Sequence, residues 1–293
     1  MCRPRQYPSI AAISLPLDTF TPSESLTTPD SPPDTRSAPF TGALARALRS
    51  WQFLDVFAPL ALSRLGLMIV GWLAMSLLNH IPTTPAWEIG PQGDIIPLEA
   101  RVSPGTYALI NMWSRWDAGW YREIAQSGYK FTPGQQSNSA FFPAYAMLMR
   151  AVHAPVASEK AVWWFLSGIV VSNVALAVAL IYLFLLTRLD FDEATARRAV
   201  LYLLIFPTTL FFSAVYPEAV FLAFLIGSFY HARKRQWWLA GILGCAAGLT
   251  RPPGIVILVG LVVEYLIQCE FNWRKLRLNV FALGLVPLGL AGT

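Results

Sequence analysis

The chain has 293 residues, of which 55% are hydrophobic and only 13% are charged, and its formal net charge is +5. Soluble domains carry about 25% charged residues, so this composition argues against a soluble globule and favours a membrane protein. The basic residues lie in short turns between apolar segments, as in the cytoplasmic loops of membrane proteins, and this argues against nucleic-acid binding.

Residues 1–41 are rich in proline, serine and threonine and contain no continuous apolar segment. This composition predicts a disordered cytoplasmic tail and argues against a secretory signal peptide. An interfacial helix carrying Arg46 and Arg49 is expected next, at 42–54. We therefore expect two parts, the tail and a transmembrane domain over 42–293.

The first apolar segment, at about 55–79, is long enough to span a membrane and contains Arg64. Three interpretations of this arginine stay open: it snorkels to the interface, the span starts later than residue 55, or the arginine faces the interior of a helix bundle. Residues 80–160 form a long, proline-rich loop, and loops of this length are usually functional. Parts of this loop are expected to form short helices along the membrane surface.

The second predicted span, at 161–187, is the clearest apolar segment of the chain. The next apolar stretch is broken at residues 216–218 (Tyr-Pro-Glu). Because proline favours the first turn of a helix, this break predicts helices at about 199–215 and 217–230.

Residues 237–268 are also apolar and are broken at 250–254 (Thr-Arg-Pro-Pro-Gly), which predicts two short spans. Another span is expected to start at about residue 280.

Three basic turns, at 188–198, 231–236 and 271–279, fall on one side of the membrane in this scheme. Since the lysine and arginine bias sets orientation, we place them in the cytoplasm. The 80–160 loop and the two breaks, with Glu218 and Arg251, then face outward. The topology permits these polar groups to meet at the outer interface.

Residues 113–121 read Trp-Ser-Arg-Trp-Asp-Ala-Gly-Trp-Tyr. Tryptophan and tyrosine prefer the membrane–water interface, where a carboxylate is partly desolvated and suited to act as a general base. Asp117 is therefore a candidate catalytic residue. Alternatively, the aromatic residues form an interfacial belt and Asp117 caps the following helix.

The three cysteines and three histidines are far apart and match no metal-binding spacing. The sequence therefore indicates neither a metal site nor a cofactor, although a requirement for a divalent metal stays open.

Residues 113–129 (WSRWDAGWYREIAQSGY) resemble the signature of the PIG-V family of integral-membrane mannosyltransferases, which is related to the second mannosyltransferase of glycosylphosphatidylinositol (GPI) anchor synthesis. The family's Arg-Trp-Asp-x-x-x-Tyr element matches Arg115, Trp116, Asp117 and Tyr121.

Three later blocks also resemble the family in its order, at 141–150, 206–221 and 239–254, so that the resemblance covers about residues 51–270. Family members usually continue with more spans beyond the position of Thr293. We therefore expect the chain to be part of a longer protein.

The resemblance implies an all-α, polytopic transmembrane bundle of the GT-C glycosyltransferase type, with a long extracytoplasmic first loop. It also implies mannosyl (hexosyl) transfer from a polyprenyl- or dolichyl-phosphate-linked donor to a glycolipid or glycan acceptor. The location would be the plasma membrane in a bacterium or the endoplasmic reticulum membrane in a eukaryote. The alternatives are a membrane transporter and a non-catalytic assembly subunit.

Within this resemblance Asp117 is the predicted base, and Arg251 is the predicted phosphate partner, with Arg115 as runner-up. Arg251 could instead snorkel to lipid headgroups, and Glu218 could instead stabilise a helix N-terminus. The candidate substrate-binding residues are Arg115, Trp116, Trp120, Tyr121, Glu218 and Arg251.

Overall fold

The computed structural model describes residues 53–78, 110, 112–131, 133–134, 137–156 and 158–291. The predicted tail at 1–41, the following Arg46 and Arg49, and the loop up to residue 109 lie outside the described residues. Within the described part of the chain every regular element is helical, which confirms the predicted all-α class.

Two helices are long and apolar enough to cross a membrane by length and composition, and both match predicted spans. The first is α2 (Ala58–Leu78), which continues the short π-helix η1 (Phe53–Phe57). The second is α7 (Ala161–Thr187), whose bounds coincide with the prediction. Apolar segments of this length can be predicted from the sequence, because their composition alone identifies them.

The apolar stretch after α7 divides into α8 (Glu193–Ile205), the 3-10 helix η3 (Pro207–Phe212) and α9 (Glu218–Arg233). The prediction of one helix over 199–215 is wrong. Pro207 lacks the N–H that a helix interior requires and disfavours helical backbone at the residue before it, so α8 ends at Ile205. The predicted start of a new helix is confirmed, because Pro217 occupies the N-cap position of α9.

The C-terminal part consists of α10 (Trp237–Gly248), η4 (Pro252–Val256), α11 (Ile257–Gln268), η5 (Trp273–Lys275), η6 (Leu278–Gly284) and α12 (Leu285–Ala291). The predicted break at 250–254 is confirmed, and the helix expected from about residue 280 begins as η6. These elements pack so closely that a side chain at Gly241 would collide with the Ala282 carbonyl.

Short helices follow residue 117, as predicted for parts of the long loop: α5 (Ala118–Ser127), η2 (Asn138–Ala140) and α6 (Pro143–His153). The helices α5 and α6 pack on the first turns of α7 through a buried cluster that includes Tyr121, Ile124, Tyr145, Met149 and Trp164. This cluster fixes the position of the segment just before α5.

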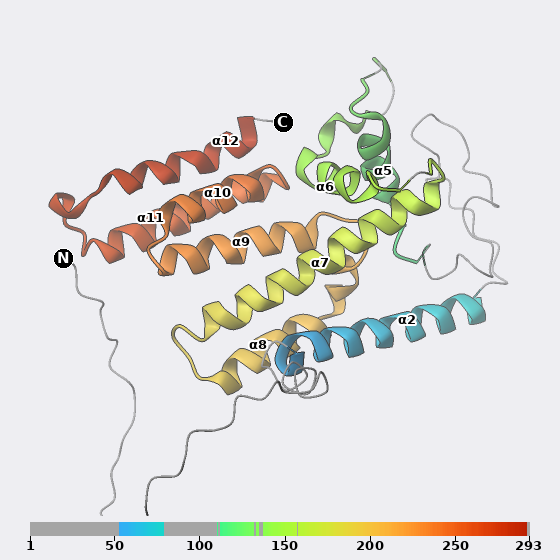
Figure 1. Cartoon of the computed structure of the whole chain (residues 1–293), viewed down its shortest axis with the longest axis horizontal. Coiled ribbons are helices and arrows are strands. Elements are labelled where there is room, and N and C mark those ends of the chain that lie inside the picture. Colours follow the sequence, from blue (N-terminus) through green and yellow to red (C-terminus); the bar gives the residue numbers. More distant parts are fainter. Residues whose placement is uncertain are drawn as a thin grey trace, which may run out of the picture.

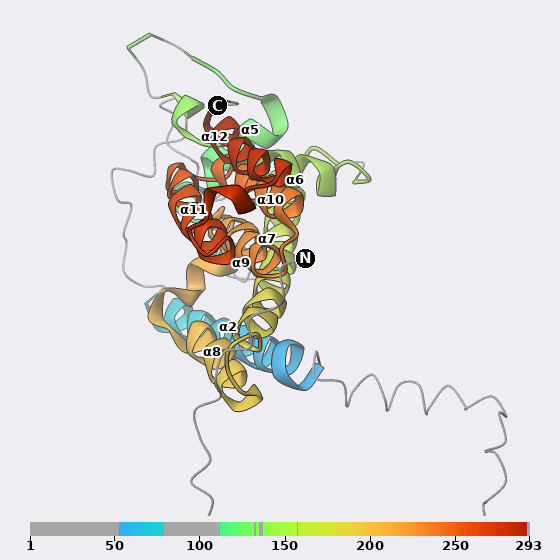
Figure 2. The ribbon, with the colours of Figure 1, turned by 90° about the vertical axis from the view of Figure 1, so that its left-hand side faces the viewer.

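The helix α7 lies between two groups of helices, with α2 and α8 on one side and α9 to α12 on the other (Figure 1). Figure 2, turned by 90°, shows the same separation. The helices α5 and α6 cover the end at which α7 begins. The start of α9 and the end of α10 lie at this same end, which we call the α5 end of the bundle.

The arginine inside the first span faces the interior. Arg64 is only 9% exposed and donates hydrogen bonds to Thr209 and Ser213, which lie in and just after η3. The interior interpretation is therefore confirmed, and the snorkelling interpretation is wrong.

Candidate functional site

Residues 113–117, which we call the motif turn, lead directly into α5 and are tied to a distant part of the chain. The Val215 N–H donates to the Trp113 carbonyl at 2.8 Å. The phenolic oxygen of Tyr216 accepts a hydrogen bond from the Asp117 N–H at 3.1 Å and donates to the Arg115 carbonyl at 3.3 Å. One tyrosine hydroxyl therefore binds both a donor and an acceptor of the motif turn.

Asp117 occupies the N-cap position of α5, but its side chain makes no capping hydrogen bond. Its backbone carbonyl accepts from the Trp120 and Tyr121 N–H groups at 3.0 and 3.3 Å. The residue is exposed. The capping interpretation is therefore not supported, and the carboxylate stands at the surface of the α5 end, where it can meet a substrate.

Trp116 has a φ of 51°, which places it in the left-handed region that non-glycine residues seldom adopt. Such a conformation costs about 1–3 kcal/mol and persists only where surrounding contacts enforce it. The side chain is 64% exposed, and its ring lies against that of Phe211 with centroids 6.1 Å apart. The motif turn therefore presents an exposed indole next to Asp117.

Glu218 and Arg251 form an ion pair, with Arg251 Nη1 2.5 Å from Glu218 Oε1. Glu218 is the first residue of α9, and Arg251 directly precedes η4. The structure therefore brings together two predicted site residues that are 33 positions apart. Glu218 Oε2 is buried without a hydrogen-bond partner, so this carboxylate retains one unused acceptor atom.

The position of Arg251 depends on a close approach of η4 to the end of α10. A Cβ at Gly254 would lie 2.5 Å from the Gly248 backbone nitrogen, so only glycine fits there. The Leu249 carbonyl accepts a hydrogen bond from the Ala144 N–H at 3.1 Å, which attaches the start of α6 to the same place. The four sequence blocks at 113–129, 141–150, 206–221 and 239–254 thus meet at the α5 end.

The tyrosines of this cluster stay protonated near neutral pH. Burial, followed by the charge of Glu218, raises the pKa of Tyr121 well above its usual range. Burial also raises the pKa of Tyr216 to about 12, against the smaller opposing effect of the Asp117 N–H. Neither phenol readily loses its proton, so a base at the α5 end must be a carboxylate. Asp117 and Glu218 are the carboxylates among the predicted site residues.

The remaining predicted residues differ in exposure. Tyr121 is buried, and its ring edges meet Phe141 and Tyr145 with centroids 5.2 and 5.1 Å away. Trp120 stacks on Phe141 at 5.9 Å. Both rings therefore hold α5 in place, whereas Arg115 contributes its carbonyl to the contact with Tyr216.

Sequence reasoning missed two residues. Tyr216 was noted only as part of a helix break, although a tyrosine next to Pro-Glu at an outward-facing break is the signal that could have found it. Arg122 lies over the Phe165 ring at 5.7 Å, and its Nε is buried without an acceptor. Burial lowers the pKa of Arg122. No sequence pattern marked it, because its position depends on how α5 packs on α7.

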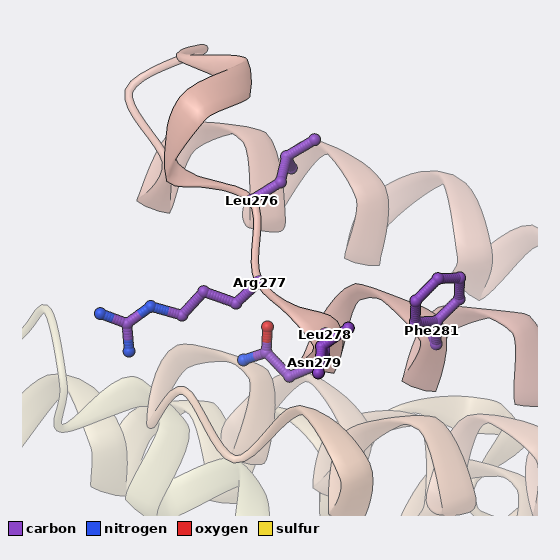
Figure 3. A pocket seen from close by; sticks show the side chains of 5 residues that line it. All are labelled: Leu276, Arg277, Leu278, Asn279 and Phe281. Carbon is purple, nitrogen blue, oxygen red and sulfur yellow. The ribbon is translucent and has the colours of Figure 1, made fainter.

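Among the described residues, no three histidine, cysteine, aspartate or glutamate side chains are grouped so that they could hold a metal ion. A pocket lined by Leu276, Arg277, Leu278, Asn279 and Phe281 lies beside the turn between α11 and η6 (Figure 3). This turn is at the end of the bundle opposite α5 (Figure 1), so the pocket is not part of the site.

Comparison with known proteins gives one family. The sequence profile described as Mannosyltransferase (PIG-V) matches residues 98–280, which is more than half of the chain. Two curated relatives named GPI mannosyltransferase 2, from Cryptococcus neoformans var. neoformans serotype D (strains JEC21 and B-3501A), are 33% identical over 151 residues. This stretch covers 48% of the chain and 34% of each relative, so the chain spans about a third of their length. No solved structure is a significant match.

Proposed function

The chain belongs to the PIG-V mannosyltransferase family, and on this premise we propose that it transfers a mannosyl (hexosyl) residue from a polyprenyl- or dolichyl-phosphate-linked donor to a glycolipid or glycan acceptor. This membership confirms the resemblance that residues 113–129 indicated. The relatives' name, GPI mannosyltransferase 2, supports mannose as the sugar. The acceptor is proposed only as a class.

The observation that carries the proposal is the exposed carboxylate of Asp117, which makes no capping hydrogen bond and whose backbone is bound by Tyr216, two residues before Glu218 of the Glu218–Arg251 pair. In the proposed step, Asp117 takes the proton of an acceptor hydroxyl, whose oxygen forms a bond to the anomeric carbon. The bond from that carbon to the phosphate oxygen breaks, and its electron pair leaves with the lipid phosphate. General-base assistance of this kind contributes about 10²–10⁴-fold.

Arg251 is the proposed partner of the departing phosphate, because a guanidinium offers parallel N–H donors to phosphate oxygens. Its side chain is 40% exposed, and Glu218 holds one of its nitrogens, which leaves other donors for a ligand. Arg115 is the runner-up. Glu218 also has an unused carboxylate oxygen that suits an acceptor hydroxyl.

We assign the aromatic residues different roles in substrate binding. Trp116 is exposed and suits stacking on a sugar ring. The ring of Tyr121 is buried, so we propose that Tyr121 binds the substrate through a hydrogen bond from its protonated hydroxyl and not by stacking. Trp120 is proposed to contribute the edge of the site, since one face of its ring packs on Phe141.

For the whole molecule we propose a GT-C-like polytopic domain over 42–293, with α2 and α7 as spans and the α5 end outside the cytoplasm. The basic turns at 188–198, 231–236 and 271–279 lie at the other end, as the positive-inside rule requires (Figure 1). The proposed location is the plasma membrane in a bacterium or the endoplasmic reticulum membrane in a eukaryote.

The experiment is incubation of membranes containing the chain with radiolabelled polyprenyl-phosphate mannose, followed by identification of the labelled product. We expect label in a glycolipid or glycan, and none in membranes without the chain. Liposomes that instead show substrate flux, with no lipid-phosphate product, would overturn the proposal in favour of a transporter.

A further inference from the structure

We propose that Arg64 is a positioning residue for the motif turn: it fixes the 207–216 segment, which in turn holds Asp117 through Tyr216. The inference rests on the proposed function for its catalytic consequence. Its structural part, the coupling of Arg64 to the motif turn, can be measured without any transfer assay.

Arg64 makes four side-chain hydrogen bonds to residues that the structure describes. Its Nη1 donates to the Thr209 carbonyl at 2.9 Å and to Ser213 Oγ at 2.8 Å. Its Nη2 donates to Thr209 Oγ1 at 2.6 Å and to Ser63 Oγ at 2.9 Å. Three of these four bonds end on the 207–216 segment, so a side chain of α2 binds this segment directly.

The guanidinium of Arg64 carries its charge in the interior of the bundle. Arg64 is buried, and among the described residues no carboxylate pairs with it; its Nε is buried without an acceptor. A buried charge without an ionic partner is costly, and an apolar side chain would fill this place in α2 at lower cost. What the guanidinium provides and an apolar side chain cannot is several directed hydrogen bonds to η3.

The 207–216 segment needs such bonds. It begins at Pro207, just after α8 ends at Ile205, and contains a 3-10 helix, whose hydrogen-bond geometry is weaker than that of an α-helix. Ser213 also donates to Asn173 Oδ1 at 2.8 Å, so the Arg64 bonds continue into α7. The segment is therefore held between α2 and α7 by polar contacts.

The contacts continue from this segment to Asp117. Directly after Ser213, the Ala214 carbonyl accepts from Ser172 Oγ at 2.7 Å, and the Val215 N–H donates to the Trp113 carbonyl at 2.8 Å. The next residue is Tyr216, whose hydroxyl binds the Asp117 N–H. Only two residues, Ala214 and Val215, separate the Arg64 contact at Ser213 from the tyrosine that holds the motif turn.

The test compares Arg64→Gln and Arg64→Lys with a matched control, Arg233→Gln. Arg233 also connects separate elements, since it forms ion pairs with Asp190, just after α7, and with Glu264 of α11. It lies at the opposite end of the bundle. Each purified full chain is first checked for folding by its elution and its unfolding midpoint in detergent.

The first readout is hydrogen–deuterium exchange of peptides that cover 112–121 and 207–216. We expect exchange at both to rise about tenfold in Arg64→Gln, since one ordinary hydrogen bond corresponds to up to roughly that factor, and to rise less in Arg64→Lys. The control should leave both peptides unchanged. Faster exchange that is confined to α2, or that occurs equally in the control, would overturn the inference.

The second readout is transfer kinetics, with Tyr216→Phe as the partner substitution. We expect Arg64→Gln to lower kcat about tenfold with the donor KM nearly unchanged, with partial rescue in Arg64→Lys. The double variant should be no worse than Arg64→Gln alone, because both changes act through one contact. Effects that multiply would overturn the inference. If exchange responds as expected but even the unaltered chain transfers no sugar, the coupling stands and the proposed function fails.

Discussion

The hydroxyl of Tyr216 holds the backbone N–H of Asp117 at 3.1 Å, although the two residues are 99 positions apart. The same hydroxyl donates to the Arg115 carbonyl. The carboxylate of Asp117 is not used in capping α5, so the turn is fixed through its backbone and the side chain is left for chemistry.

The raised pKa of Tyr216 predicts that the folded chain loses stability at alkaline pH. Burial raises its pKa from 10.0 to about 12, so the folded state keeps the phenolic proton more tightly than the unfolded chain. This contribution to stability is complete below pH 10 and is lost as pH rises through about 12. We expect Tyr216→Phe to lose less stability than the unaltered chain over this interval. Unfolding midpoints in detergent check this, and equal losses in the two proteins would contradict it.

Arg251 is expected to bind phosphate through its planar donors as well as its charge. Arg251→Lys keeps the charge and loses the fork, so we expect the donor KM to rise about tenfold with a smaller change in kcat. Arg251→Gln should be worse. Steady-state kinetics with varied lipid-phosphate mannose measures both. Lys275→Gln, which removes an ion pair to Glu270 at the opposite end, is the control and should leave the donor KM unchanged.

We expect Trp116 to destabilise the fold while it contributes to substrate binding, because its φ of 51° suits glycine better than tryptophan. We expect Trp116→Gly to raise the free energy of unfolding by about 1 kcal/mol while it lowers transfer severalfold. Chemical denaturation and initial rates measure the two effects. Trp238→Ala, at a similarly exposed tryptophan of α10, should not lower transfer. A Trp116→Gly chain that is fully active would refute a role in substrate binding.

Gly254 should be required for the turn that places Arg251. An alanine there would press on the backbone at Ala247 and Gly248, which should destabilise the chain by about 1–3 kcal/mol and displace Arg251. Gly66→Ala is the control, because nothing lies within 4 Å of a Cβ at that position. Denaturation curves together with the donor KM distinguish the two. An unchanged KM in Gly254→Ala would mean that the close approach does not set Arg251.

The sequence was most informative where local composition decides the structure. The apolar run of α7 and the breaks at Pro217 and Pro252 could be predicted because chain length, hydropathy and proline geometry act locally. The end of α8 was missed although the same rule applies to Pro207, because the apolar run continues past it and hid the break.

The candidate site could be predicted as a list of residues but not as a geometry. Asp117 was identified from its aromatic surroundings and from the family motif, and Glu218 and Arg251 from two helix breaks that the topology permits to meet. The Tyr216 contact and the inward direction of Arg64 depend on packing between segments about 100 to 150 positions apart. No local pattern encodes such contacts.

Asp117→Asn is the most direct test, with radiolabelled polyprenyl-phosphate mannose as donor. Asparagine keeps the size of the side chain and the backbone bond to Tyr216, but it cannot accept the acceptor's proton. We expect a fall in kcat of about 10²–10⁴-fold with normal membrane insertion and an unchanged unfolding midpoint. Glu270→Gln, at an exposed carboxylate of the opposite end, should transfer normally. Transfer by Asp117→Asn within a few-fold of the unaltered chain would contradict the assignment of Asp117 as the base.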